Sequence, residues 1–124
     1  MMSDCIEIGI IQDIDSCIDY SCFDHPDDYK VCLEKYHCIS IPDDVVNEWI
    51  PLTEEMKTYR GSLKKADVGI NHYGVTIIPP SSLDSFKKIV ISQTENVESK
   101  IIMELIRLLD AAIEHNCYII CYGI

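Results

Sequence analysis

The sequence predicts a single α+β domain, in which a mixed β-sheet packs with two main C-terminal helices. Two neighbouring segments carry this prediction. Residues 97–115 place apolar side chains along one face of a helix, and residues 117–124 carry apolar side chains on both faces of a strand. A one-sided helix beside a two-sided strand indicates a central strand covered on both faces. A chain of 124 residues has the length of one domain and can bury a core without metals or disulfides.

The first third of the chain is expected to contribute two strands and one short helix. Cys5–Ile11 alternates apolar residues with small or polar ones, which predicts a strand. A short helix is expected from about Asp13, because apolar residues recur there at helical spacing and early acidic residues favour the helix dipole. Tyr29–Ile41 is predicted as a strand region that includes a hairpin around Glu34, and Tyr36–Ile41 as a strand of the main sheet.

The middle of the chain contains shorter signals. Asp43 or Asp44 is expected to cap a short helix whose apolar side includes Trp49. Thr53 is expected to cap a further short helix, because two glutamates and a methionine follow it. Ala66–Ile70 is predicted as a strand.

The second half gives the clearest pattern. Val75–Ile78 is a β-branched run that two prolines end, which predicts a buried strand. Pro80 or the serine after it then opens a helix over about Ser81–Ile91. Val97–His115 is the strongest helix, and Asn116 suits a left-handed cap after it. The sheet is therefore expected to contain Cys5–Ile11, Tyr36–Ile41, Val75–Ile78 and Tyr118–Tyr122.

The net charge of −11 is concentrated in the first half. Residues 1–55 carry nine Asp and five Glu against two lysines, a net of −12, whereas residues 56–124 carry a net of +1. Such a field repels nucleic acid and anionic membranes and attracts basic partners. No apolar run approaches the roughly 20 residues that a membrane span needs. We therefore expect neither nucleic acid nor membrane as a partner.

Seven cysteines are expected to be free thiols. The count is odd and no C-x2-C pair is present, which is untypical of a zinc site or a redox motif. The first residues show no basic segment ahead of an apolar one, so no signal peptide is expected. The predicted compartment is cytoplasmic, where thiols stay reduced.

No metal or other cofactor is expected. The spacing from Asp13 to Asp24 imitates a calcium loop, but Cys17 and Ile18 occupy positions where a ligand and a glycine belong. Cys117 and Cys121 would lie about 13 Å apart along a strand, at about 3.3 Å per residue, which is too far for one tetrahedral zinc ion.

A Cys–His enzyme is one alternative function. His72 lies in a turn and is the candidate base, with Cys38 or Cys121 as the candidate nucleophile. No phosphate-binding loop or hydrolase motif accompanies them. The other alternative is a regulatory or scaffold subunit that binds a protein partner.

The strongest functional signal is an acidic segment interspersed with aromatic residues. Aromatic anchors within a charged rim are typical of a protein-binding surface. The alternative is that the acidic residues are a solvated surface and that the aromatic residues belong to the core. The candidate partner-binding residues are Asp13, Asp15, Asp19, Tyr20, Asp24, Asp27, Asp28, Tyr29, Asp43, Asp44, Glu48 and Trp49.

The C-terminal half also resembles a known group. The segment Gly69–Leu83, which reads GINHYGVTIIPPSSL, and the ending Tyr118–Ile124, which reads YIICYGI, are similar to immunity proteins of bacterial contact-dependent inhibition and other polymorphic toxin systems. These motifs are structural rather than catalytic. The resemblance implies a non-enzymatic inhibitor that binds one cognate toxin domain, often a basic nuclease.

Overall fold

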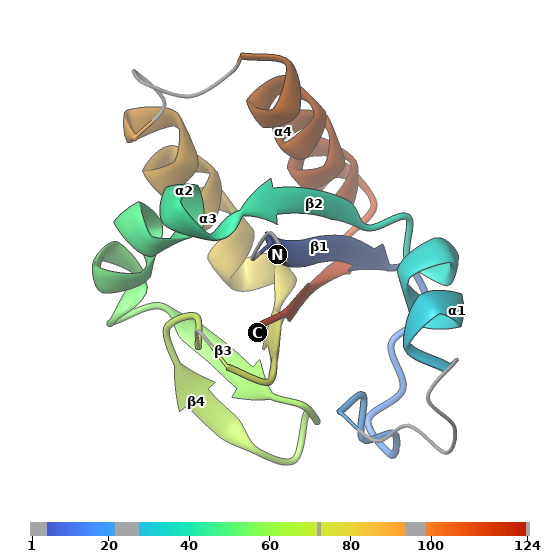
Figure 1. Ribbon diagram of the computed structural model, residues 1–124. Coiled ribbons are helices and arrows are strands. Elements are labelled where there is room, and N and C mark those ends of the chain that lie inside the picture. The colour runs from blue at the N-terminus through green and yellow to red at the C-terminus, as the bar shows by residue number, and fades with distance from the viewer. Residues whose placement is uncertain (1–4, 22–27, 72, 94–98, 124) are drawn as a thin grey trace.

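The computed structural model describes residues 5–21, 28–71, 73–93 and 99–123, which form one β-sheet with helices packed on it (Figure 1). The strands are β1 (Cys5–Ile11), β2 (Ile39–Pro42), β3 (Lys57–Arg60), β4 (Ala66–Val68), β5 (Val75–Ile78) and β6 (Tyr118–Tyr122). The helices are α1 (Asp28–Lys35), α2 (Asp43–Trp49), α3 (Pro80–Ser92) and α4 (Ser99–Glu114), with a 3-10 helix, η1, at Ile50–Thr53. The predicted α+β class is confirmed. None of the described helices combines the length and the apolar character that crossing a bilayer requires.

The strand order is β2-β1-β6-β5-β3-β4, and each neighbouring pair is antiparallel. The predicted mixed sheet is therefore wrong. Two helices, α3 and α4, connect β5 to β6. The first carries the chain away from the end of β5 and the second brings it back to that end, so β6 runs antiparallel to β5. The central place of β6, between β1 and β5, agrees with the prediction from its two apolar faces.

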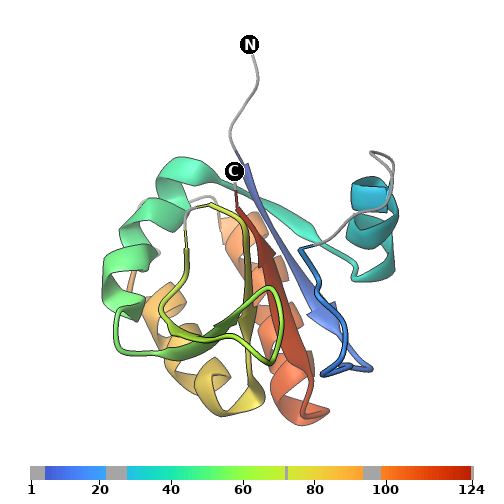
Figure 2. The same cartoon turned by 90° about the horizontal axis from the view of Figure 1, so that it is seen from below.

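The larger core lies between the sheet and the helices α2, α3 and α4 (Figure 2). From β6, Ile119 and Cys121 face this core, and the helices contribute Trp49, Phe86 and Leu105 among others. All five side chains are buried. The predicted helices over 81–91 and 97–115 are confirmed where the structure describes them, and α3 begins at Pro80 as expected.

A second, smaller core covers the opposite face of the sheet. Tyr118, Ile120 and Tyr122 of β6 point to this side, because alternate strand residues face opposite ways. The segment after β1 and helix α1 pack over them. We call its tyrosines the tyrosine cluster: Tyr20, Tyr29, Tyr36, Tyr59, Tyr118 and Tyr122.

Helix α1 replaces the strand and hairpin that were predicted near Glu34. Tyr29, Cys32, Leu33 and Tyr36 follow the spacing i, i+3, i+4, i+7, and all four pack into the second core. Tyrosine and cysteine occur readily in strands, which made this segment look extended. The strand begins only at Ile39, so the predicted strand over 36–41 is correct in its last three residues.

Two short helices predicted near Asp13 and Thr53 are absent from the described residues. After β1 the chain forms turns, because the Oδ1 atoms of Asp15 and Asp19 accept the nearby backbone N–H groups of Cys17 and Ser21, at 2.8 and 3.0 Å. Thr53 ends η1 instead of opening a helix. Its hydroxyl donates to the Ile50 carbonyl at 2.8 Å and accepts the Ile70 N–H at 3.0 Å.

Helices α1 and α4 end on non-glycine residues in the left-handed conformation. His37 has φ of 53° and Asn116 has φ of 55°. Each is followed by a cysteine whose N–H bonds back to the last turn: Cys38 to the Leu33 carbonyl and Cys117 to the Ala112 carbonyl. The predicted role of Asn116 as a left-handed cap is confirmed.

The two edge strands, β2 and β4, offer few free backbone N–H groups. Across the β3–β4 pair, the Arg60 N–H donates to the Lys65 carbonyl and the Gly69 N–H donates to the Met56 carbonyl. By the antiparallel alternation, Ala66 and Val68 therefore point their N–H groups outward. The Val68 N–H is bonded to Oδ1 of Asp67 at 2.8 Å. On β2, by the same alternation, the outward positions are Ser40 and Pro42, and a proline has no N–H. Each described edge strand therefore exposes one unbonded N–H.

Replacing Gly9 of β1 with Ala is expected to lower the free energy of unfolding by about 1–3 kcal/mol. A Cβ at this position would lie 2.5 Å from Sγ of Cys38 and 2.8 Å from the backbone oxygen of Tyr36. Urea unfolding of the variant and the parent measures the difference. Removing the thiol with Cys38→Ala in the Gly9→Ala background should recover only part of the loss, since the backbone contact stays. A loss below about 0.5 kcal/mol would contradict this packing.

Candidate partner-binding surface

The predicted site residues divide between the two faces of the sheet. Asp13, Asp15 and Asp19 belong to the segment that packs with the second core, whereas α2 carries Asp43, Asp44, Glu48 and Trp49 on the side of the larger core. Figures 1 and 2 show α2 and the segment after β1 at opposite ends of the molecule. The predicted residues therefore form two separate acidic groups. Asp24 and Asp27 lie outside the described residues, and Asp28 is the first residue of α1.

The three aromatic residues proposed as anchors lie in the cores. Trp49 is 0% exposed, and its ring packs edge-to-face on Phe86 with the ring centroids 6.0 Å apart. Tyr20 is 6% exposed. Tyr29 is half-buried, with its ring edge-to-face on Tyr122 at 5.4 Å. In this conformation Trp49 and Tyr20 are core residues, which corrects their assignment as surface anchors.

The carboxylates after β1 have local structural roles. Asp15 and Asp19 accept backbone N–H bonds that close the turns, and Asp19 also accepts the Ser21 hydroxyl. Asp13 is exposed, and among the described residues it accepts no backbone N–H of either turn. Two of these three carboxylates, those of Asp15 and Asp19, therefore stabilise the turns after β1.

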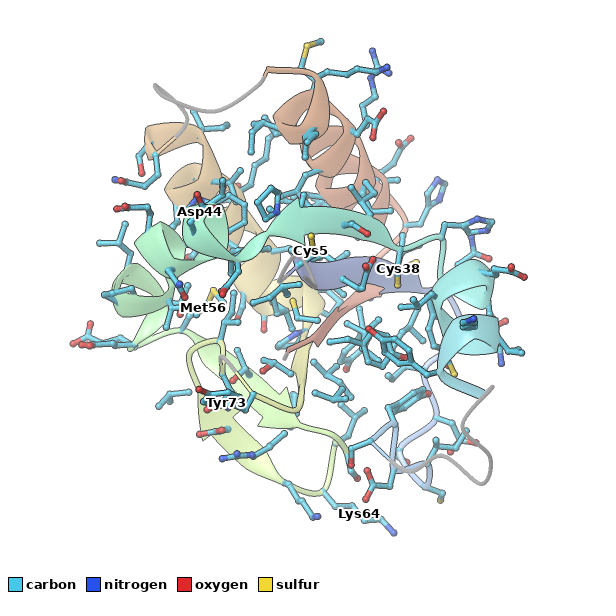
Figure 3. The ribbon with its side chains drawn as sticks, in the orientation of Figure 1. Cys5, Cys38, Asp44, Met56, Lys64 and Tyr73 are labelled. Carbon is cyan, nitrogen blue, oxygen red and sulfur yellow. The ribbon has the colours of Figure 1, made fainter. Side chains whose placement is uncertain are left out.

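The group on α2 contains two exposed carboxylates, those of Asp44 and Glu48, and Oδ1 of Asp44 accepts the Val45 N–H at 3.0 Å. Asp44 and Glu48 are exposed and lie four residues apart on one face of α2 (Figure 3 labels Asp44). Glu54 and Glu55 are exposed directly after η1. Across the described part of the chain, none of these four carboxylates forms an ion pair. Between Lys35 and Lys57 the sequence contains no lysine or arginine.

An apolar side chain lies among these carboxylates. Leu52, in η1, is 51% exposed, and Pro51 beside it is also exposed. Because η1 continues the helical path of α2, positions 44, 48, 52 and 55 follow one another at intervals of three or four residues. We call this the α2–η1 surface, made of Asp44, Asn47, Glu48, Pro51, Leu52, Glu54 and Glu55.

Sequence reasoning missed Pro51, Leu52, Glu54 and Glu55. The stretch from Thr53 was expected to open a new helix, so its acidic residues were assigned to a helix start rather than to the surface of α2. One sequence signal does point to them, namely the interval between Lys35 and Lys57 that lacks any basic residue.

The thiols of the Cys–His alternative are poorly suited to nucleophilic chemistry. Burial, with Glu7 nearby, raises the pKa of Cys38 from its ordinary 9.0 to about 12, and burial raises that of Cys121 to about 12. Both thiols are therefore protonated at neutral pH, and the thiolate is the reactive form. His72 lies outside the described residues. The six cysteines that the structure describes are free thiols, and Cys22 falls outside it.

Within the described residues, His, Cys, Asp and Glu side chains nowhere gather in threes as a metal site would require. Comparison of the chain with protein-family models, with curated proteins and with solved structures finds no match. The case for a function therefore depends on the surface itself.

Proposed function

We propose that this protein is a non-enzymatic immunity protein, which binds and neutralises a cognate bacterial toxin domain through the α2–η1 surface. The observation that carries the proposal is a half-exposed leucine among four unpaired carboxylates. An apolar centre with a charged rim is the usual composition of a protein interface. The chemistry of the rim calls for a basic partner.

A nuclease is the partner class that best fits this charge. Its cleft is lined with lysine and arginine, because its substrate is a polyanion. An acidic surface that enters such a cleft competes with the substrate and needs no catalytic group of its own. Long-range attraction between opposite charges raises the association rate by about 10–10³-fold at low ionic strength.

Neutralising the rim is expected to slow association with the toxin domain at least about tenfold at low salt and to flatten the salt dependence. The variant is Asp44→Asn with Glu48→Gln and Glu55→Gln. The partner to test is the C-terminal domain of a large secreted protein encoded beside this chain in the genome, coexpressed with it, purified as a complex and then separated from it. Stopped-flow association at several ionic strengths gives the rate, and a nucleic-acid cleavage assay gives the inhibition.

A matched variant with the same change in charge controls for the net field. Glu34→Gln with Glu104→Gln and Glu114→Gln removes three exposed carboxylates outside the α2–η1 surface. This control should associate with the toxin domain at nearly the rate of the parent protein.

Leu52→Ala should leave the association rate nearly unchanged and speed dissociation by about tenfold, because central apolar contacts mainly set the lifetime of a complex. Equal rates for the parent and the rim variant would exclude this surface as the docking site.

A further inference from the structure

A hollow of about 260 Å³ lies between the segment after β1 and the end of α1. We call it the β1–α1 hollow. These two chain segments lie side by side in both ribbon views (Figures 1 and 2). Tyr20 and Tyr36, which line the hollow, belong to the second core. The hollow therefore lies on the opposite face of the sheet from the α2–η1 surface. Its volume is slightly below the usual range of small-molecule sites, about 300–1,000 Å³, so a suitable ligand is small.

One side of the hollow is apolar. The side chains of Ile11 and Ile18 lie on this face and line it, and Ile18 is 45% exposed, whereas the side chain of Ile10 belongs to the larger core on the other face of the sheet. The ring of Tyr36 adds an aromatic surface, over which Nζ of Lys35 lies 5.6 Å from the ring centroid. A lysine held over an aromatic face keeps its charged end at the hollow while its stem covers apolar atoms.

Two buried tyrosines, Tyr20 and Tyr36, also line the hollow. Tyr20 is 6% exposed, and its oxygen accepts the Asp15 N–H at 2.9 Å, which leaves its own proton to be donated. Tyr36 is 8% exposed, and its hydroxyl has no hydrogen bond to any residue that the structure describes. Burial raises the pKa of Tyr36 to about 12, so this hydroxyl stays a donor at neutral pH.

Two opposite charges line the hollow without pairing. Asp13 is exposed on the β1 side, and Lys35 is exposed at the end of α1. Among the described residues, neither forms an ion pair with the other or with a third group. The carboxylate and the ammonium thus stand at one small hollow, each free to bind a group of opposite sign.

We propose that the β1–α1 hollow binds a small zwitterion with an apolar side chain, an apolar α-amino acid. Its ammonium group pairs with Asp13, and its carboxylate pairs with Lys35 and accepts a tyrosine O–H. Its side chain lies on the isoleucines. A simple anion would leave Asp13 without an ion-pair partner and the apolar side chains in contact with water. A hydrocarbon would leave both Asp13 and Lys35 without an ion-pair partner. A zwitterion matches all three features of the hollow.

The first test compares L-leucine with two derivatives, each of which lacks one of its two backbone charges. L-leucine, N-acetyl-L-leucine and L-leucinamide are titrated to millimolar concentration against the ¹⁵N-labelled full chain. L-leucine is expected to shift the amide signals of Gln12, Asp13 and His37, which line the hollow. The acetylated ligand lacks the ammonium and the amide lacks the carboxylate, so each should bind at least about tenfold more weakly.

The second test assigns each charge to its partner. Asp13→Asn should weaken L-leucine about tenfold and leave N-acetyl-L-leucine unchanged. Lys35→Gln should weaken L-leucine to the same degree and leave L-leucinamide unchanged. Both residues are exposed and unpaired, so the variants should fold as the parent does. Asp44→Asn, on the α2–η1 surface, is the matched control and should not alter leucine binding.

Several results would overturn the proposal. They are the absence of leucine-dependent shifts around the hollow, equal affinity for the three ligands, and an equal effect of Asp44→Asn and Asp13→Asn. None of these results bears on the toxin-binding proposal, because its variants lie on the opposite face of the sheet. Loss of toxin binding in the rim variant would likewise leave the amino-acid titration unaffected.

Discussion

Trp49→Ala is expected to lower the free energy of unfolding by about 3–5 kcal/mol, a large share of the 5–15 kcal/mol typical of a domain. The indole is fully buried, packs on Phe86, and belongs to the core between α2 and the sheet. Removing it leaves a cavity that the rigid sheet fills only in part. Urea unfolding followed by circular dichroism measures the loss, since the variant has no tryptophan to report by fluorescence.

Two further variants make this prediction specific. The indole N–H of Trp49 is buried without a hydrogen-bond partner in the described structure, so Trp49→Phe removes that cost and should destabilise less than Trp49→Ala. Leu52→Ala, three residues further along on the surface, should change stability by less than about 0.5 kcal/mol. A loss below about 1 kcal/mol for Trp49→Ala would mean that the indole is not a core residue and would restore it as a candidate anchor.

Stability is expected to fall steeply as the pH rises from about 9 towards 12. Burial raises the pKa of Cys38 and Cys121 from 9.0 to about 12, and that of Tyr36 from 10.0 to about 12. The unfolded chain releases these protons near pH 9–10, whereas the folded chain retains them. Rising pH therefore favours the unfolded state, from the unfolded pKa until the folded pKa is passed.

Urea midpoints measured from pH 7 to pH 11 test this dependence. Cys121→Ala should lower the stability at pH 7 through lost packing, yet its stability should fall less between pH 9 and pH 11. Cys17→Ala is the control, because it removes an exposed thiol and leaves the buried thiols in place. Identical slopes for the parent and Cys121→Ala would show that Cys121 ionises equally in both states.

The sequence could predict those elements whose apolar pattern had one clear period. Helix α4 and strand β6 follow periods of 3.6 and 2 over long or uninterrupted runs, and both were located correctly. Helix α1 was missed because its buried residues are tyrosine and cysteine, which fit a strand as well. The turns after β1 were missed because Asp15 and Asp19 bond to the local backbone, which an apolar pattern does not record.

The sequence shows that the first half of the chain is acidic, but it does not show that the acidic residues form two separate groups. Asp13 and Asp44 are 31 residues apart in the sequence, and only the packing of their segments in different cores places them on opposite faces of the sheet. Burial of Trp49 depends on Phe86, which comes from a helix far along the chain. A surface anchor and a core tryptophan look the same in a local sequence pattern, so the assignment needed the three-dimensional contact.

The edge strands β2 and β4 also restrict how this molecule can assemble. A polymer of stacked sheets grows when one chain presents a row of hydrogen-bonding groups that templates the next chain. On β2, Pro42 has no N–H to offer, and on β4 the Val68 N–H is already bonded to the Asp67 carboxylate. Each described edge strand therefore keeps one free outward N–H. The shortage of free N–H groups therefore disfavours sheet-to-sheet pairing along either edge strand. A partner that adds a strand to this sheet would therefore find fewer backbone donors than a regular edge provides.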